Sequence, residues 1–271
     1  MDAEIGIIGG TGFYQFLSNA TTVLPSTPFG PPSAPLTIGD VAGRRVAFVP
    51  RHGQRHQFPP HRVNYRANLW ALRSVGVRQV IAPAAVGSLR PELGPGTFVV
   101  PDQVIDRTWG RKHTVYHGKG QVVHVGFADP YCPRGRAAVL GAADADVRPV
   151  DGGTLVVING PRFSTKAESR WHAASGGTVV GMTGMPEASV ARELAMCFTT
   201  VCLVTDHDAG VDGGEAVTHA EVLAQFGGNI ERMKALLKRT IAAMPGSEPD
   251  SRASCACRRA LDGQPLPFEL P

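Results

Sequence analysis

Two carboxylates at the end of an apolar run are the residues in this sequence best suited to chemistry. The run FTTVCLVTD (198–206) leads into TDHDAG, where Asp206 and Asp208 flank His207. Such a pair serves as a metal site, as a catalytic acid or as a polar turn, and the local sequence leaves all three open. Alternation along a strand end places His207 on the face opposite the two aspartates.

A dense group of basic side chains follows another apolar run. It contains Arg51, His52, Arg55, His56, His61 and Arg62. Such a loop suits an oxyanion such as phosphate, because arginine offers a planar fork of donors. The histidines have no carboxylate at metal-ligand spacing and arginines stand between them, so phosphate is favoured over a metal. Arg55 and Arg62 also fit a solvated loop.

Two further strand ends carry candidate ligand contacts. The GGTG motif at 9–12 places backbone N–H groups and the Thr11 hydroxyl where they suit an anion, although a tight glycine turn explains it equally well. It has neither the lysine of a P-loop nor G-x-G-x-x-G spacing. In INGPRFSTKAES (158–169), Phe163 offers a flat apolar surface beside Ser164, although such a phenylalanine more often belongs to a core.

The elements that must position these residues alternate along the chain. Short β-branched runs bounded by Gly and Pro predict buried strands at 4–10, 44–50, 78–88, 96–106, 153–160, 176–184 and 198–206. Apolar periodicity predicts helices at 63–76, 132–143, 166–175 and 185–196. This alternation predicts a mainly parallel sheet covered on both faces, and open α/β folds bind ligands at the carboxyl ends of such strands.

The last predicted helix starts at a capping box formed by Thr218 and Glu221. Its apolar face contains Val222, Phe226, Ile230, Met233, Leu237 and Ile241. His219 falls in the first turn, where the helix dipole disfavours an imidazolium, so we expect a neutral, hydrogen-bonding ring. After about residue 245 the sequence loses both periods, which predicts an irregular tail.

Composition narrows the class of protein. The chain has 271 residues, 43% of them hydrophobic, and a net charge of only +4. It has no dense Lys/Arg run for nucleic acid, and no leader pattern or long apolar stretch for a membrane, so we expect a cytoplasmic globular protein. The odd number of cysteines, five, predicts reduced thiols, and the C-x-C pair Cys255 and Cys257 lacks partners for a zinc site.

Eight ordered blocks together resemble the trimeric purine nucleoside phosphorylases, and among them the 5′-methylthioadenosine phosphorylase branch. They are IGIIGGTGFY (5–14), RHGQRH (51–56), VNYRANLWAL (63–72), GSLRPELGPGTFVVPDQVIDRT (87–108), FADPYCP (127–133), INGPRFSTKAES (158–169), MTGMPE (182–187) and TDHDAG (205–210). The resemblance implies a single-domain α/β fold with a mixed, partly barrel-like central sheet flanked by helices, over residues 1–245, before the tail at 246–271. It also implies a homotrimer that splits a purine nucleoside with phosphate, without a metal or a cofactor.

The resemblance assigns roles to the matching positions. The phosphate-binding positions match Thr11, Arg51, His52, Ala85 and Thr183, and the ribose positions match Met182 and His56. The base site matches Phe163, Ser164, Asp206 and Asp208. The pocket for the 5′ substituent matches His219 and Val222, together with His124 from the neighbouring subunit.

The two aspartates and Ser164 favour a 6-aminopurine. Relatives that act on 6-oxopurines have Asn at the first aspartate and Glu at Ser164, because a 6-oxo group needs a donor whereas a 6-amino group needs an acceptor. A protonated Asp206, its pKa raised by burial and by Asp208, is expected to donate to purine N7 as the glycosidic bond breaks. Phosphate is expected to attack the anomeric carbon from the opposite side.

His219 departs from the methylthio branch, which usually has an apolar residue there; the 6-oxopurine branch has a histidine that binds the 5′-hydroxyl. The expected substrate is 5′-methylthioadenosine. Adenosine, 2′-deoxyadenosine, another 5′-modified 5′-deoxyadenosine and a 6-oxopurine nucleoside such as methylthioinosine are the alternatives. A solvent-facing histidine, a nucleosidase that uses water and a silent nucleoside-binding protein also stay open.

Overall fold

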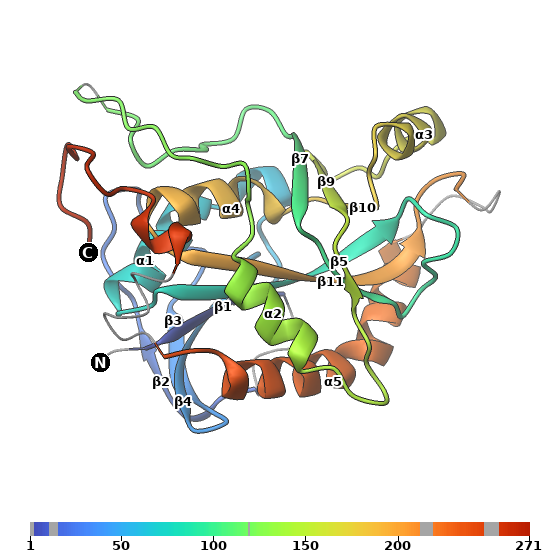
Figure 1. The fold of residues 1–271 in the computed structure, drawn as a ribbon, viewed down its shortest axis with the longest axis horizontal. Coiled ribbons are helices and arrows are strands. Elements are labelled where there is room, and N and C mark those ends of the chain that lie inside the picture. The colour runs from blue at the N-terminus through green and yellow to red at the C-terminus, as the bar shows by residue number, and fades with distance from the viewer. Residues whose placement is uncertain (1–2, 11–15, 119, 212–218, 247–254) are drawn as a thin grey trace.

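Two long parallel strands, β5 (Gln79–Ser88) and β11 (Cys197–His207), run side by side through the centre of the molecule (Figure 1). Nearly all their residues are buried, as the sequence predicts for strands covered on both faces. The computed structural model describes residues 3–10, 16–118, 120–211, 219–246 and 255–271, and at 219–223 it describes the backbone alone.

Within the described residues, an eleven-stranded mixed sheet surrounds β5. One branch runs through β2 (Ser18–Val23), β3 (Leu36–Val41), β4 (Arg44–Pro50) and β1 (Ile5–Gly9) to β5. A second continues from the end of β5 through β10 (Val179–Gly181), β9 (Thr154–Ile158) and β7 (Gln103–Arg107). The third is formed by β11, β6 (Phe98–Val100) and β8 (Val150–Asp151). The mixed sheet expected from the resemblance is confirmed.

The alternation of strands and helices alone predicts the sheet less well. It predicts a mainly parallel sheet, whereas β2, β3 and β4 form an antiparallel meander. Neither β2 nor β3 was predicted: β2, with the sequence SNATTV, is polar and largely exposed, whereas β3, with the sequence LTIGDV, is mostly buried and was overlooked. The predicted strand at 96–106 is divided into β6 and β7 around Pro101, which has no backbone N–H to donate to a ladder.

Helices cover both faces of the central strands (Figure 1). On one face lie α1 (Tyr65–Ser74) and α4 (Gly184–Glu193), and on the other lie α2 (Pro133–Gly141) and α5 (His219–Ala243). A further helix, α3 (Lys166–Ala174), packs Ala173 against residues of β9 and β10. Two 3-10 turns complete the set, η1 (Pro60–Arg62) and η2 (Ala256–Arg259). The helices predicted from periodicity are therefore confirmed, with small shifts at their ends.

Side-chain alternation along β11 connects it to both helical layers. Cys202 and Val204 belong to the apolar cluster with α1 and α4, whereas Val201 and Leu203 belong to the cluster with α5. On the predicted apolar face of α5, Met233, Leu237 and Ile241 are fully buried and Phe226 and Ile230 are partly buried. The capping pair Thr218 and Glu221 and the side chain of Val222 lie outside the described residues. Burial on both sides fixes β11, and with it the position of the residues at its end.

The C-terminal segment folds back over the body of the protein. Phe268 stacks on Tyr116 with ring centroids 5.2 Å apart and meets Trp70 at 5.7 Å. Further along the same surface, the side-chain amide of Gln264 exchanges two hydrogen bonds with the backbone of His124. Across the residues that the structure describes, no helix is both long enough and apolar enough to cross a membrane.

Candidate active site

A cavity of about 540 Å³ opens where β1, β4, β9, β10 and β11 end, beside the last residues of β5. Nine residues singled out in the sequence line it: Arg51, His52, His56, Ala85, Phe163, Met182, Thr183, Asp206 and Asp208. They come from segments up to 157 residues apart, which the strand ends bring to one place. Strand ends are the expected ligand site of such a fold.

The two aspartates reach the cavity because β11 is irregular at its end. A register shift between Val204 and Asp206 lets Thr205, Asp206 and Asp208 all line the cavity. Thr205 donates its hydroxyl hydrogen bond to Oδ1 of Asp206 at 2.7 Å. Gly87 permits the close approach of β5 to the end of β11, since a Cβ at Gly87 would lie 3.0 Å from Oδ2 of Asp206.

Two buried polar atoms at the predicted base site have no hydrogen-bond partner among the described residues. They are Oδ2 of Asp208 and the hydroxyl oxygen of Ser164. Ser164 is buried beside Phe163 but does not itself line the cavity, whereas Phe163 is half-buried in its wall. Buried polar groups in native proteins almost always have partners, so Oδ2 of Asp208, whose residue lines the cavity, favours a polar ligand at this end of the cavity.

An arginine that sequence reasoning missed holds the wall formed by Met182. The buried guanidinium of Arg111 donates to the carbonyl oxygens of Met182 at 2.8 Å and of Asn159 at 2.9 Å. It also contacts the ring of Tyr65, with 5.4 Å from Cζ to the ring centroid. A single arginine in a polar loop carries no sequence signal of this role. Gly160 allows the backbone to pass close to Met182, because a Cβ at this position would lie 2.7 Å from the Met182 sulfur.

The expected anion fork of Arg51 is occupied by a carboxylate. Nε and Nη2 of Arg51 donate to Oε1 and Oε2 of Glu187 at 2.6 and 3.1 Å, and both side chains are at most 4% exposed. Nη2 also donates to Ile8 O at 3.0 Å, and Nη1 donates to Pro83 O at 3.2 Å. Of the five guanidinium N–H groups, these bonds leave one, on Nη1. The planar fork that the sequence suggests for an oxyanion is therefore bonded to Glu187 in this structure, and Arg51 also lines the cavity.

His52 enters the cavity as a neutral ring. Burial and the neighbouring charge of Arg51 lower the pKa of His52 to about 4. Its Nδ1 lies 2.8 Å from Phe58 O, and because a carbonyl only accepts, Nδ1 carries the proton. The remaining nitrogen, Nε2, is then an acceptor. The ring stacks on His56, with centroids 4.4 Å apart, and His56 is held at φ 54°.

Thr183 offers a hydroxyl to the same cavity. It stands at the N-cap position of α4 but makes no side-chain capping bond. Thr183 is 9% exposed and lines the cavity together with Ala85. A hydroxyl that does not cap its own helix is available to a ligand.

The other residues assigned to the site or to the basic loop are either exposed or not described. Thr11 and the side chains of His219 and Val222 lie outside the described residues. His124 is exposed, is bonded to Gln264, and does not line the cavity of its own chain. Arg55, His61 and Arg62 are exposed, which fits the solvated loop.

The described part of the chain does not support a metal at TDHDAG or among the histidines of the loop. The metal-compatible group found among the described residues consists of cysteines and lies elsewhere. His207 does not line the cavity and pairs with Pro91 O at 3.2 Å, as strand alternation predicts. Asp206 and Asp208 themselves line the cavity.

Known proteins share this fold and sequence over nearly the whole chain. A purine nucleoside phosphorylase of Streptomyces coelicolor is 57% identical, over 99% of this chain and 98% of its own. An S-methyl-5′-thioadenosine phosphorylase of Mycolicibacterium smegmatis is 54% identical, over 98% and 99%. The crystal structure of a methylthioadenosine phosphorylase from an antarctic soil metagenomic library superposes with a TM-score of 0.86 at 39% identity, covering 96% of this chain and 91% of that one. The model of the Phosphorylase superfamily matches residues 4–242, which include every residue that lines the cavity, and the chain belongs to that family.

Proposed function

We propose that the protein is a nucleoside phosphorylase that cleaves a 6-aminopurine nucleoside, foremost 5′-methylthioadenosine, to adenine and 5-methylthioribose 1-phosphate. One observation carries the proposal: a single cavity has anion-binding groups from Arg51, His52 and Thr183 and carboxylates from Asp206 and Asp208. The first set suits phosphate and the second suits a 6-amino group and N7. The names of the Streptomyces and Mycolicibacterium relatives support the same reaction.

The residues divide the reaction between the two ends of the cavity. Asp206, in its protonated form, donates to purine N7 as the glycosidic bond lengthens, so that the base leaves neutral. The one remaining N–H of Arg51 and the hydroxyl of Thr183 donate to phosphate, whereas Nε2 of His52 accepts from its P–OH group. Phosphate then attacks the anomeric carbon on the face away from the base and stabilises its positive charge.

The 5′ substituent is the open point within this function. The two relatives carry different names, one for purine nucleosides and one for methylthioadenosine. His219 is a poor wall for a methylthio group and a good partner for a hydroxyl, which favours adenosine, 2′-deoxyadenosine or another 5′-modified nucleoside as the second candidate. His219→Val is expected to raise the preference for 5′-methylthioadenosine over adenosine, and an unchanged ratio of kcat/KM contradicts the role of His219.

A substrate panel with and without phosphate tests the proposal. 5′-Methylthioadenosine, adenosine, 2′-deoxyadenosine, inosine and methylthioinosine are each incubated with enzyme, and release of the base is followed. We expect adenine from the 6-aminopurine nucleosides and only when phosphate is present. Turnover without phosphate means a nucleosidase, binding without turnover means a silent binding protein, and faster cleavage of inosine contradicts the adenine-reading role of the aspartates.

Several properties complete the proposal. The reaction needs no metal and no cofactor besides phosphate as co-substrate, and the expected setting is purine and methionine salvage in the cytoplasm. The catalytic domain spans 1–245 and the tail 246–271. The assembly is a homotrimer in which His124 completes the 5′ pocket of the neighbouring subunit. His124 is exposed and lies outside the cavity of its own chain, which is compatible with that role. A monomer in light scattering at working concentration would contradict the trimer.

A further inference from the structure

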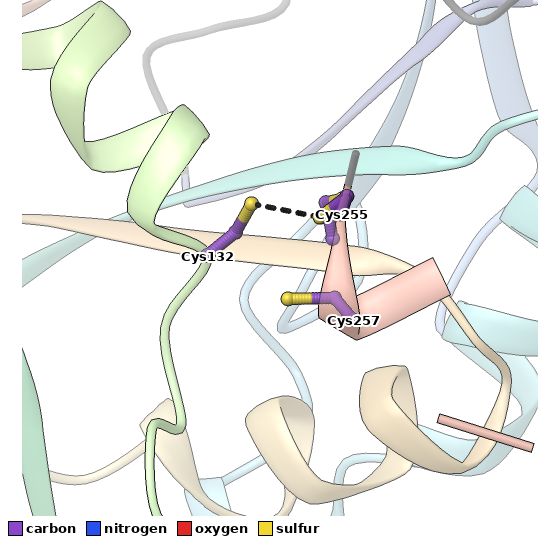
Figure 2. A group of neighbouring side chains, drawn as sticks. Cys132, Cys255 and Cys257 are labelled. Atoms are coloured by element: carbon purple, nitrogen blue, oxygen red, sulfur yellow. Dashed lines mark hydrogen bonds between the residues drawn. The ribbon is translucent and has the colours of Figure 1, made fainter. Parts of the chain in front are cut away.

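Four cysteines from three separate segments of the chain meet at one point outside the cavity, and Figure 2 labels three of them, Cys132, Cys255 and Cys257. Cys132 precedes α2, Cys197 begins β11, and Cys255 and Cys257 flank the start of η2. All four are buried, and their sulfur atoms lie within 4.8 Å of one another. The interpretation that the C-x-C pair lacks partners is therefore wrong, because the fold supplies two.

We propose that these four cysteines bind one zinc ion in a closed tetrathiolate site. Zn–S bonds of about 2.3 Å place tetrahedral sulfur atoms roughly 3.8 Å apart. The Cys132 and Cys197 sulfurs lie 3.6 and 3.2 Å from that of Cys255. Small rotations about the Cα–Cβ bonds therefore suffice to form the tetrahedron.

The surroundings of the cluster suit thiolates. Nη2 of Arg192 lies 3.7 Å from the Cys257 sulfur, and the same guanidinium is fixed by the carbonyl oxygen of Asp129 at 2.6 Å. Cys132 stands at the N-cap position of α2, where the positive end of the helix dipole favours a thiolate. Zinc binding releases the four thiol protons to solvent, and four thiolates with Zn²⁺ carry two negative charges. Arg192 and the N-terminal end of α2 stabilise that charge.

The position of the cluster indicates a structural and not a catalytic ion. Cys197 and Asp206 stand at opposite ends of β11, nine residues apart, which corresponds to roughly 30 Å along a strand. Four protein ligands also leave no open position for a substrate or water. The ion instead joins the C-terminal segment, through Cys255 and Cys257, to α2 and β11.

Two disulfides are the competing outcome, because the same four thiols can be oxidised. All five cysteines of the chain are free in the structure, and Cys202 is buried outside the cluster. Mass and metal content distinguish the possibilities, since each disulfide removes two hydrogens and zinc adds its own mass. Cys202→Ala is the matched control, because it removes a buried thiol that is not a ligand.

The experiment measures zinc in the full-length protein purified without chelator from zinc-supplemented cells. We expect one zinc per chain, retained in Cys202→Ala and lost in the double variant Cys255→Ser with Cys257→Ser. Treating the wild type with a strong chelator is expected to lower Tm by several degrees, and Zn²⁺ is expected to restore it. Should the double variant not fold, the visible absorption of Co²⁺ added to chelated wild type decides, because a tetrahedral tetrathiolate has a distinct spectrum. Metal-free protein with reduced thiols, or protein with two disulfides that binds no zinc after reduction, overturns the proposal.

Discussion

Removing the charge of Glu187 is expected to destabilise the protein and to make its stability depend on phosphate. Glu187→Gln keeps the size of the side chain but leaves the guanidinium of Arg51, 4% exposed, without its counter-charge. Breaking a buried ion pair by removing one partner costs about 3–5 kcal/mol. Each kcal/mol lowers Tm by about 2–4 °C in a chain of this size, so Tm is expected to fall by roughly 10 °C.

Phosphate is expected to recover part of this loss, because it supplies a negative charge beside Arg51. Recovery of about 1.4 kcal/mol corresponds to phosphate binding about tenfold more tightly to the variant than to the wild type. Ligand stabilisation grows with the ratio of free ligand to Kd, so phosphate should raise the Tm of the variant further than that of the wild type. Thermal unfolding of both proteins across a phosphate titration, without nucleoside, measures the difference.

Two further variants separate this mechanism from general loss of stability. Glu193→Gln alters another buried carboxyl, which accepts from the Val115 N–H at 2.8 Å and does not line the cavity. It should lose stability without a stronger response to phosphate. The double variant Arg51→Met with Glu187→Met removes both charges and should regain stability but lose the response. Equal phosphate responses in Glu187→Gln and wild type would refute the placement of this pair at the phosphate subsite.

The remaining predictions concern the two ends of the cavity. Asp206→Asn should lower kcat/KM for 5′-methylthioadenosine by about 100-fold or more while inosine loses less, and equal losses would contradict its role in reading the base. The pKa of His52 is about 4 in the native protein and 6.5 in the unfolded chain, so between pH 4 and pH 6.5 unfolding takes up a proton at this ring. The stability that His52 contributes as a neutral ring is therefore fully present above pH 6.5. Stability should fall by up to about 3 kcal/mol as pH drops from 6.5 towards 4, and urea titrations of His52→Gln should lose that part of the slope. Sulfate, which has no proton to donate to Nε2 of His52, should compete with phosphate about 10-fold or more weakly; comparable inhibition constants would contradict the acceptor role.

The local pattern of apolar and polar residues was sufficient to predict the helices and the long buried strands. Helix α3 has a complete capping box in Thr165 and Glu168, and the apolar face of α5 is buried as its spacing predicts. β2 could not be found in this way, because its residues are polar and its pairing with β3 is fixed by a distant partner strand. Residue patterns report which faces are buried, and they carry little information on an exposed edge strand.

The sequence predicted which residues line the cavity, but it did not predict which side chains bond to one another. Nine of the residues singled out do line one cavity, because strand ends that follow apolar runs converge. The ion pair between Arg51 and Glu187 joins positions 136 residues apart, and Cys132 meets Cys255 across 123. Neither partner has a local signal, since a glutamate after MP and a cysteine before PRG look ordinary in the sequence. Only the fold shows that one arginine is neutralised and that a C-x-C pair has two more thiols.

Under the proposed function, the ion pair of Arg51 changes how the cavity recognises phosphate. Six basic residues in the loop suggest a strongly positive site, yet Arg51 is paired with Glu187, and His52 is neutral near pH 7 because its pKa is lowered to about 4. Under the proposed function, phosphate recognition therefore depends on directed hydrogen bonds with one N–H of Arg51, the hydroxyl of Thr183 and the acceptor Nε2 of His52. Such a set discriminates anions by the number and direction of their protons, which charge alone cannot do. The pairing also lowers the free-energy cost of the site without phosphate, because the buried guanidinium of Arg51 keeps Glu187 as its counter-charge.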